Sequence, residues 1–230
     1  MKKLLLLGGS RYLLPVIREA KALGIYTISC DYLPDNIAHR YSDEYHNVSI
    51  IEKDSVLALA RELEIDGIMS FACDPGVVTA AYVAEKLSLP SCGPCKSVEI
   101  LQNKNLFRAF LRDNGFNVPK FRDYGSIEEA ISDSSYFSFP VIVKPVDSAG
   151  SKGVSRADSA SMLEKACKYA MDNSIGGRII VEEFITQQGF ASDTDSFSID
   201  GKLCFCSFNS QYFDKNADYS LCRSVFSCVW

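Results

Sequence analysis

The chain has 230 residues, of which 47% are hydrophobic and 23% are charged, and its formal net charge is -5. A chain of this length can bury one large core or two modest ones. The acidic balance gives no electrostatic reason to expect nucleic acid or an anionic membrane as a partner, so any basic site must be local.

The first ten residues, MKKLLLLGGS, place two lysines before a run of leucines, as a signal peptide does. Only four apolar residues precede Gly8 and Gly9, whereas a signal core needs roughly 7 to 15. No apolar stretch approaches the ~18 to 20 residues of a membrane span. The nine cysteines are scattered along the chain, which is typical of free thiols in a reducing compartment. We therefore expect a soluble, cytoplasmic protein, for which a homodimer is one option.

The first ninety residues alternate expected strands with expected helices. Apolar or β-branched runs fall at 3–9, 25–31, 46–51 and 66–72, and helical spacing falls at 11–24, 53–65 and 75–89. Strands separated by helices of about ten to fifteen residues predict parallel β-α-β units. Pro75 near a helix start and Gly24 just past a helix end agree with the usual positions of these residues.

The pattern changes after residues 90–97, PSCGPCKS, where glycine and two prolines predict a boundary. We expect one amphipathic helix over 97–115, with Gly115 as its C-cap. Ser126 is expected to open a short helix, and Asp200–Gly201 favours a hairpin turn. The remaining expected elements are strands at 118–124, 139–146 and 177–185 and a helix at 158–173. The sequence predicts an α/β half followed by an α+β half of mainly antiparallel strands.

The stretch VKPVDSAGSKGV places a lysine, Lys144, at the end of an apolar strand. Gly150 and Gly153 permit a tight loop whose backbone N–H groups converge, and such a loop binds phosphate. Ser148 and Ser151 add hydroxyl donors. The pattern is neither a Walker A loop nor a dinucleotide fingerprint. The alternative is a flexible hairpin loop whose lysine reaches into solvent.

The stretch IIVEEFI places two carboxylates after three apolar residues. Glu182 and Glu183 face opposite sides of a strand, so one of them points toward the interior. A carboxylate there can accept the amino proton of adenine, and a backbone N–H near Phe184 or Ile185 can donate to its ring. The alternative is an edge strand with both acids in solvent.

The order of these motifs resembles the ATP-grasp superfamily. The segments are NK…FR.FL.DNG..VP, then FPVIVKP.DSAGSKGV, then VEEFI and DGKL. The resemblance covers nearly the whole chain and is closest to the carboxylate–amine ligases that are similar to the carbamoyl phosphate synthase large subunit. It implies a Rossmann-like domain over 1–93, the N-terminal part of an ATP-grasp domain over 94–218, and an atypical tail over 219–230.

The resemblance also implies roles for particular residues. Lys104, otherwise a typical surface lysine, and Lys144 become the two nucleotide-contacting lysines. The glycine loop, with Ser148, Gly150, Ser151 and Gly153, covers the phosphates. Glu182, Glu183, Phe184 and Ile185 form the adenine hinge. Asp195 is the candidate for the ribose-binding carboxylate, with Asp193 as a neighbour that fits as well.

ATP-grasp ligases phosphorylate a carboxylate with ATP and Mg²⁺ and then let an amine, or a thiol, displace the phosphate. Relatives supply magnesium ligands well past the hinge, from an acidic residue and an E-x-N pair. Nothing after DGKLCFCSFNSQYF matches this pair, so we name no metal ligand and no catalytic residue. We expect an incomplete ATP-grasp fold, from a truncated or frame-shifted chain or with a divergent last strand. A non-catalytic nucleotide-binding or interaction module is the alternative function.

The N-terminal half carries weaker signals. By resemblance to ATP-grasp relatives, Gly9, Ser10, Asp31 and Asp74 are candidate substrate residues, with a structural role in the core as the alternative for each. The same region suggests a dinucleotide site, but Leu13 stands where the third glycine belongs.

Cysteine and histidine patterns suggest two further functions. Cys92 and Cys95 form a C-x-x-C with a Gly-Pro interior, which makes a thiol redox protein a remote alternative. His39 and His46 have no acids or cysteines at ligand spacing, so neither is expected to bind a metal.

Overall fold

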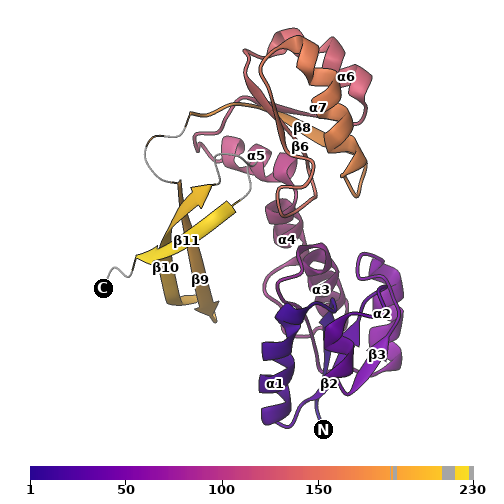
Figure 1. The fold of residues 1–230 in the computed structure, drawn as a ribbon. Coiled ribbons are helices and arrows are strands. Elements are labelled where there is room, and N and C mark those ends of the chain that lie inside the picture. The colour runs from indigo at the N-terminus through magenta and orange to yellow at the C-terminus, as the bar shows by residue number, and fades with distance from the viewer. Residues whose placement is uncertain (187, 189–190, 214–220, 228–230) are drawn as a thin grey trace. The chain divides into compact units, whose positions relative to one another are not determined.

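The computed structural model describes residues 1–186, 188, 191–213 and 221–227 (Figure 1). The chain divides into two compact units, Met1–Phe110 and Leu111–Trp230. The family domain boundaries proposed at residues 93 and 218 stay predictions. Among the described residues, no helix combines the length and the apolar character that crossing a bilayer requires.

The first unit is built on a four-stranded sheet in the order β3-β2-β1-β4 (Figure 1). All three strand pairs are parallel, as the sequence predicts. The strands are β1 (Lys3–Leu7), β2 (Tyr26–Cys30), β3 (Glu44–His46) and β4 (Gly67–Ser70). The helices are α1 (Leu14–Ala22), α2 (Lys53–Glu62), α3 (Asp74–Leu87) and α4 (Cys95–Gln102), with short 3-10 turns η1 (Arg11–Leu13) and η2 (Ile37–Arg40). The boundary between the two units falls within α5 (Lys104–Asp113).

Helices cover both faces of this sheet, which explains the unbroken apolar run of β1. Leu5 and Leu7 point to one face and pack with residues of α2 and α3. Leu6 points to the other face and packs with Ile17 of α1. A strand that is buried on both faces has no polar alternation, as is usual in parallel sheets.

Two predicted elements of this unit were wrong in their bounds. The expected strand at 46–51 is β3, which already ends at His46; Ile50 is buried in the core although it lies in a turn. The helix expected over 97–115 breaks at Asn103, whose backbone is extended (φ -93°, ψ 115°). The Asn103 side chain donates to the Glu99 carbonyl at 2.9 Å and so closes α4 before α5 begins.

The second unit contains a four-stranded antiparallel sheet in the order β5-β8-β6-β7. The strands are β5 (Phe121–Tyr124), β6 (Val141–Pro145), β7 (Ser155–Ala157) and β8 (Ile179–Glu183). The helices are α6 (Ile127–Ser132), the 3-10 turn η3 (Ser134–Tyr136) and α7 (Ala160–Asp172). Ser126 caps α6 as predicted, since its hydroxyl accepts from the Glu129 N–H at 3.2 Å. The apolar core between the sheet and these helices contains Val143, Val181 and Leu163.

A three-stranded antiparallel sheet in the order β11-β10-β9 follows. Its strands are β9 (Ala191–Ile199), β10 (Lys202–Phe213) and β11 (Leu221–Ser227). Asp200 and Gly201 both have positive φ, 49° and 76°, so the predicted hairpin turn is confirmed. Of the predicted tail, residues 221–227 pair with β10, while 219–220 and 228–230 lie outside the described residues.

Candidate functional site

A buried ion pair joins the two central strands of the second unit. Lys144 Nζ lies 2.7 Å from Glu182 Oε2, and the two side chains are only 17% and 5% exposed. Lys144 comes from β6 and Glu182 from β8, which are paired neighbours. The structure therefore brings together the cation and one carboxylate that the sequence singled out separately.

The pair lies on the sheet face opposite the helices. Val143 and Val181 belong to the core under α7, so the residues that alternate with them, Lys144 and Glu182, point the other way. In the register, Ile142 lies opposite Glu182, and Lys144 lies opposite Ile180. Two isoleucines thus flank the ion pair on this face; Ile180 is fully buried and Ile142 is partly exposed.

The hinge at the end of β8 has three backbone N–H groups, those of residues 183–185. Two of them already donate hydrogen bonds within the protein. The Glu183 N–H donates to the Lys120 carbonyl at 2.8 Å, and the Phe184 N–H donates to the Pro140 carbonyl at 3.3 Å. Within the part of the chain that the structure describes, the Ile185 N–H donates to no protein acceptor. Of the two N–H groups considered for the adenine ring, Ile185 is the one available.

Glu183, the second acid of the hinge, faces away from the ion pair. It is exposed, and its carboxylate accepts from the Lys120 N–H at 3.2 Å. This contact links β8 to the segment that enters β5, which is a structural role.

The glycine loop between β6 and β7 is fixed at both ends. Asp147 accepts from the Ser174 hydroxyl at 2.9 Å and from the Gly176 N–H at 2.6 Å. Ser148 Oγ donates to the carbonyl of Asn173. At the far end, a Cβ on Gly153 would lie 2.6 Å from Pro145 Cγ, so only glycine fits there. Both ends of the loop are thereby held against the turn that follows α7.

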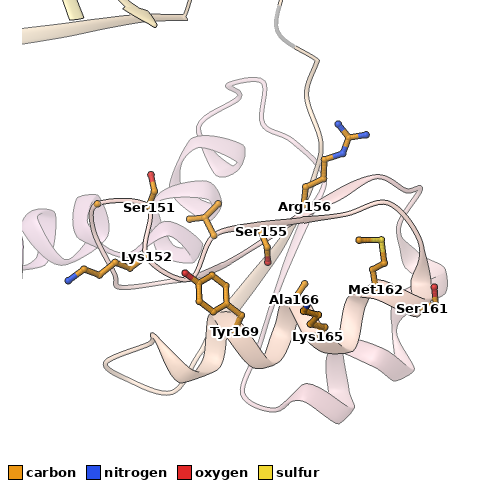
Figure 2. A pocket seen from close by; sticks show the side chains of 11 residues that line it. Ser151, Lys152, Ser155, Arg156, Ser161, Met162, Lys165, Ala166 and Tyr169 are labelled. Carbon is orange, nitrogen blue, oxygen red and sulfur yellow. The ribbon is translucent and has the colours of Figure 1, made fainter. Parts of the chain in front are cut away.

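The tip of the loop is open. Gly150 has φ 65° and meets no atom within 4 Å of an added Cβ, and Ser151 also adopts a positive φ, 59°. Ser151 and Lys152 are exposed at this tip (Figure 2). The Ser148 hydroxyl is engaged by the protein, so the tip itself offers the donors that remain for a phosphate.

Sequence reasoning missed the residues that position this loop and the hinge. Asp147 and Asn173 make contacts across 25 or more positions of the chain, and no local pattern marks such a contact. The guanidinium of Arg156 lies 4.4 Å from the ring centre of Phe184 and holds that ring beside β7. The alternation of β7 was the available signal, because it places Arg156 on the Lys144 face.

Two further nucleotide candidates belong to other elements of the chain. Lys104 is the first residue of α5, is half-buried and belongs to the first unit. Asp195 lies in β9 and is exposed, and its carboxylate is 3.5 Å from Asn209 Nδ2. Their roles toward a nucleotide stay predictions.

The four substrate candidates lie where the parallel strands of the first unit end. Gly9 and Ser10 follow β1, Asp31 follows β2, and Asp74 begins α3 after β4. The carboxyl edge of a parallel sheet, at the point where strand order reverses, is the usual ligand position in such folds. Asp31 is 6% exposed, and its two oxygens accept from the Leu33 N–H and from the Asn36 amide.

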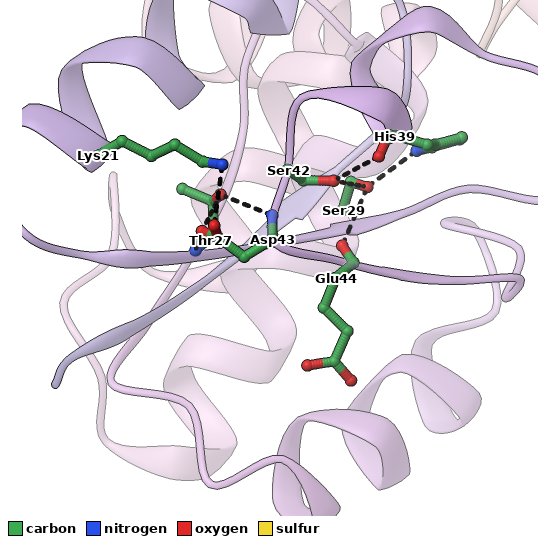
Figure 3. Close-up of polar contacts among 7 residues, drawn as sticks. All are labelled: Lys21, Thr27, Ser29, His39, Ser42, Asp43 and Glu44. Carbon is green, nitrogen blue, oxygen red and sulfur yellow. Dashed lines mark hydrogen bonds and ion pairs between the residues drawn. The ribbon is translucent and has the colours of Figure 1, made fainter.

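A polar network supports the loop after β1. A Cβ on Gly9 would come within 2.6 Å of His39 Cε1, so the imidazole packs directly on this glycine. His39 Nδ1 lies 2.9 Å from Ser29 Oγ, which lies 2.7 Å from Ser42 Oγ (Figure 3). The ring stacks on Tyr45 with centres 3.9 Å apart. His39 therefore has a packing role at the candidate substrate edge.

The second cysteine of the C-x-x-C pair lies in surroundings that disfavour its thiolate. Burial, and then the nearby carboxylate of Glu99, raise the pKa of Cys95, whereas a redox nucleophile needs a lowered pKa. Cys92 is an exposed free thiol. Among the described residues, no three His, Cys, Asp or Glu side chains gather where they can hold a metal ion.

Comparison with known proteins agrees with this geometry. A family profile described as D-ala D-ala ligase C-terminus matches residues 110–192. The formate-dependent phosphoribosylglycinamide formyltransferase of Methanocaldococcus jannaschii is 30% identical over 187 residues, which are 80% of this chain and 48% of that protein. The enzyme of the same name from Synechococcus sp. is 27% identical and matches 99% of this chain and 57% of its own length.

Solved structures give the same fold. The L-amino acid ligase from Bacillus licheniformis superposes with a TM-score of 0.76 at 24% identity, over 100% of this chain and 55% of that one. The N5-carboxyaminoimidazole synthetase from Staphylococcus aureus complexed with ADP superposes with a TM-score of 0.71 at 14% identity, over 93% and 55%.

These findings define the class of the fold: the chain has the fold of ATP-grasp ligases. The resemblance to the ATP-grasp superfamily that the motifs predict is confirmed. It spans about half the length of the curated relatives that it matches.

Proposed function

We propose that this chain supplies the nucleotide-binding part of an ATP-dependent carboxylate–amine ligase that acts through an acyl phosphate. The observation that carries the proposal is the ion pair between Lys144 and Glu182, buried on the sheet face opposite α6 and α7. Replacing a buried ion pair with apolar residues is often neutral or stabilising, so the pair is weak evidence for stability alone. A ligand that needs both charges explains its presence better.

In this proposal, residues of this face contact the base and the phosphates of ATP. Ile142, which is partly exposed, offers an apolar contact for the flat base. Glu182 accepts the adenine amino proton, and the Ile185 N–H, which has no acceptor among the described residues, donates to the ring. Lys144 turns from Glu182 toward the phosphates and supplies a positive charge in a site of low exposure.

The glycine loop completes this arrangement. Its fixed ends leave the N–H groups near Gly150 and Ser151 to converge on the phosphates. In the reaction that we propose, a substrate carboxylate attacks the terminal phosphorus, ADP leaves, and an amine then displaces phosphate from the acyl carbon. Lys144 and the loop stabilise charge on the phosphates as they transfer.

Magnesium enters the proposal only as the ion that accompanies ATP. The described residues hold no cluster of ligands for it, so we derive no step through the metal from this part of the chain. The substrates that the relatives' names state belong to those proteins, and the carboxylate and the amine of this one are not assigned.

Calorimetric titration with a non-hydrolysable ATP analogue tests the nucleotide site. We expect Lys144→Met to weaken binding by more than about tenfold, because a charge-assisted contact to phosphate is lost. The double variant Lys144→Met with Glu182→Leu removes both members of the ion pair and should also fail to bind while it stays folded.

Two controls accompany this titration. Lys168→Met removes an exposed lysine of α7, and Cys92→Ser removes an exposed thiol; both should bind as the unaltered chain does. Equal affinity in the unaltered chain and in Lys144→Met contradicts the proposal. Binding that is lost in Cys92→Ser contradicts it as well, since the thiol then matters.

A further inference from the structure

We propose that an open depression between the glycine loop and α7 is a second ligand site, for a small anion that carries an apolar group. The depression has a volume of about 790 Å³, within the range of about 300 to 1,000 Å³ that is usual for small-molecule sites. Ser155 lies in it between Lys152 on one side and Lys165, Met162 and Tyr169 of α7 on the other (Figure 2). The depression and the proposed nucleotide site share the tip of the glycine loop, Gly150 and Ser151, but they lie on opposite faces of the sheet.

Strand register places the depression on the opposite face of the sheet from the Lys144–Glu182 pair. Ser155 lies opposite Val143, a core residue under α7, whereas Arg156 lies opposite Ile142 on the other face. Figure 2 agrees, since the Ser155 hydroxyl lies on the α7 side of β7 and the Arg156 guanidinium is directed away from α7. A ligand in the depression therefore does not occupy the face assigned to ATP.

The Ser155 hydroxyl is the first sign of a ligand. Its oxygen is buried and has no hydrogen-bond partner in the described part of the chain. Buried polar groups are normally paired, and an unpaired one that borders a depression calls for a water molecule or a ligand atom. A hydroxyl can donate to an anionic oxygen as well as to water.

The charge of the lining is the second sign. None of the residues that line the depression is acidic, although the chain as a whole has a net charge of -5. Among the described residues, Lys152 and Lys165 form no ion pair. Two unpaired cations at one depression create a local positive potential that favours an anion.

The apolar wall is the third sign. Met162 and Tyr169 lie on the exposed side of α7 and are 45% and 49% exposed. Methionine adapts its shape to varied partners, and tyrosine offers a flat apolar surface with a polar tip. Together with the lysines they fit a ligand that joins a phosphate or carboxylate to a ring or a branched alkyl group.

The test uses the full chain labelled with ¹⁵N and titrated with phenyl phosphate, benzoate and inorganic phosphate. We expect saturable amide shifts centred on Ser155 and Tyr169, with phenyl phosphate binding more tightly than inorganic phosphate because of its ring. Comparing the affinities of phenyl phosphate and benzoate shows whether the site prefers a phosphate or a carboxylate.

Matched variants locate the site. Lys165→Gln should weaken phenyl phosphate binding about tenfold, because it removes a charge-assisted contact. Lys168→Gln, on the same helix but outside the depression, should change it less than about twofold. Ser155→Ala should weaken binding without loss of folding, since it removes only the unpaired hydroxyl. Lys144→Met should leave binding here unchanged, whatever it does to the ATP analogue.

Three results would overturn the inference. The first is the absence of saturable shifts at millimolar ligand, which means that the depression holds only water. The second is an equal loss of affinity in the Lys165 and Lys168 variants, which means that only general surface charge matters. The third is a set of shifts confined to Ile180 and its neighbours, which places the probe on the other face.

Discussion

Each unit of the molecule buries a carboxylate, and the two carboxylates are held in different ways. Asp31 in the first unit is 6% exposed and accepts from neutral groups, the Leu33 N–H and the Asn36 amide. Glu182 in the second unit is 4% exposed and pairs with a cation from a neighbouring strand. Burial alone therefore does not mark an acid as functional; the partner that holds it is more informative.

The difference lies in what each acid does for the fold. Asp31 organises its own loop, within five residues of the chain, and its burial needs no ligand to explain it. Glu182 brings a lysine to a sheet face where two apolar residues would be at least as stable. The three predictions below test this contrast, from the largest expected effect to the smallest.

Replacing one member of the ion pair should cost far more than replacing both. Glu182→Leu leaves Lys144 buried without its partner and should lower the free energy of unfolding by about 2–4 kcal/mol. The double variant Lys144→Met with Glu182→Leu should return to within about 1 kcal/mol of the unaltered chain. Urea unfolding followed by circular dichroism measures each value. A double variant as unstable as the single one would show that the pair is structural.

Asp31→Asn should cost stability but not nucleotide binding. The amide keeps one acceptor but turns its N–H₂ toward a group that is itself a donor. We therefore expect the free energy of unfolding to fall by about 1–2 kcal/mol. The affinity for the ATP analogue should stay unchanged in the same calorimetric titration. A fall in affinity as large as that of Lys144→Met would contradict the purely structural role of Asp31.

A third acid, Asp43 of the first unit, should give a pH signature. Burial alone would raise the pKa of Asp43, but Lys21 at 2.8 Å and two hydrogen bonds from Thr27 outweigh it and lower the pKa from 3.8 to about 2 (Figure 3). A lowered folded-state pKa stabilises the fold above the ordinary value, and this contribution is lost as the pH falls from 3.8 toward 2.

Because Lys21 is 40% exposed and solvent screens the pair, we expect a contribution of only about 1 kcal/mol. The measurement is the stability difference between the unaltered chain and Asp43→Asn, by urea unfolding at neutral pH and again near pH 2. The difference should shrink toward zero at the acidic end. A difference that stays constant over this range argues against the lowered pKa.

The elements that the sequence predicted well are those with local causes. Ser126 and Asp200–Gly201 signal a cap and a turn through residues that lie next to them, and both are confirmed. The break at Asn103 was missed because the apolar spacing continues through it, and a single side-chain contact to Glu99 decides the end of α4. A pattern of apolar spacing does not register such a contact.

In the candidate site too, the sequence predicted the features with local causes and missed those that depend on distant parts of the chain. Strand alternation was enough to predict that one of Glu182 and Glu183 points inward, and the motif order was enough to single out Lys144. Which acid meets the lysine depends on the register of β6 against β8, and a sequence alone does not fix this register. The contacts of Asp147 with the turn after α7 were out of reach for the same reason, since they join distant parts of the chain.

The glycine loop is anchored at its two ends, so its length can change at the tip without loss of the anchors. Asp147 and Ser148 hold one end and the close packing of Gly153 holds the other, while Gly150 between them has open space on its Cβ side. Inserting a residue beside Gly150 would lengthen the loop without disturbing either anchor, at a small entropic cost. The tip is therefore the place where protein engineering, or natural variation, can adjust how far the loop extends.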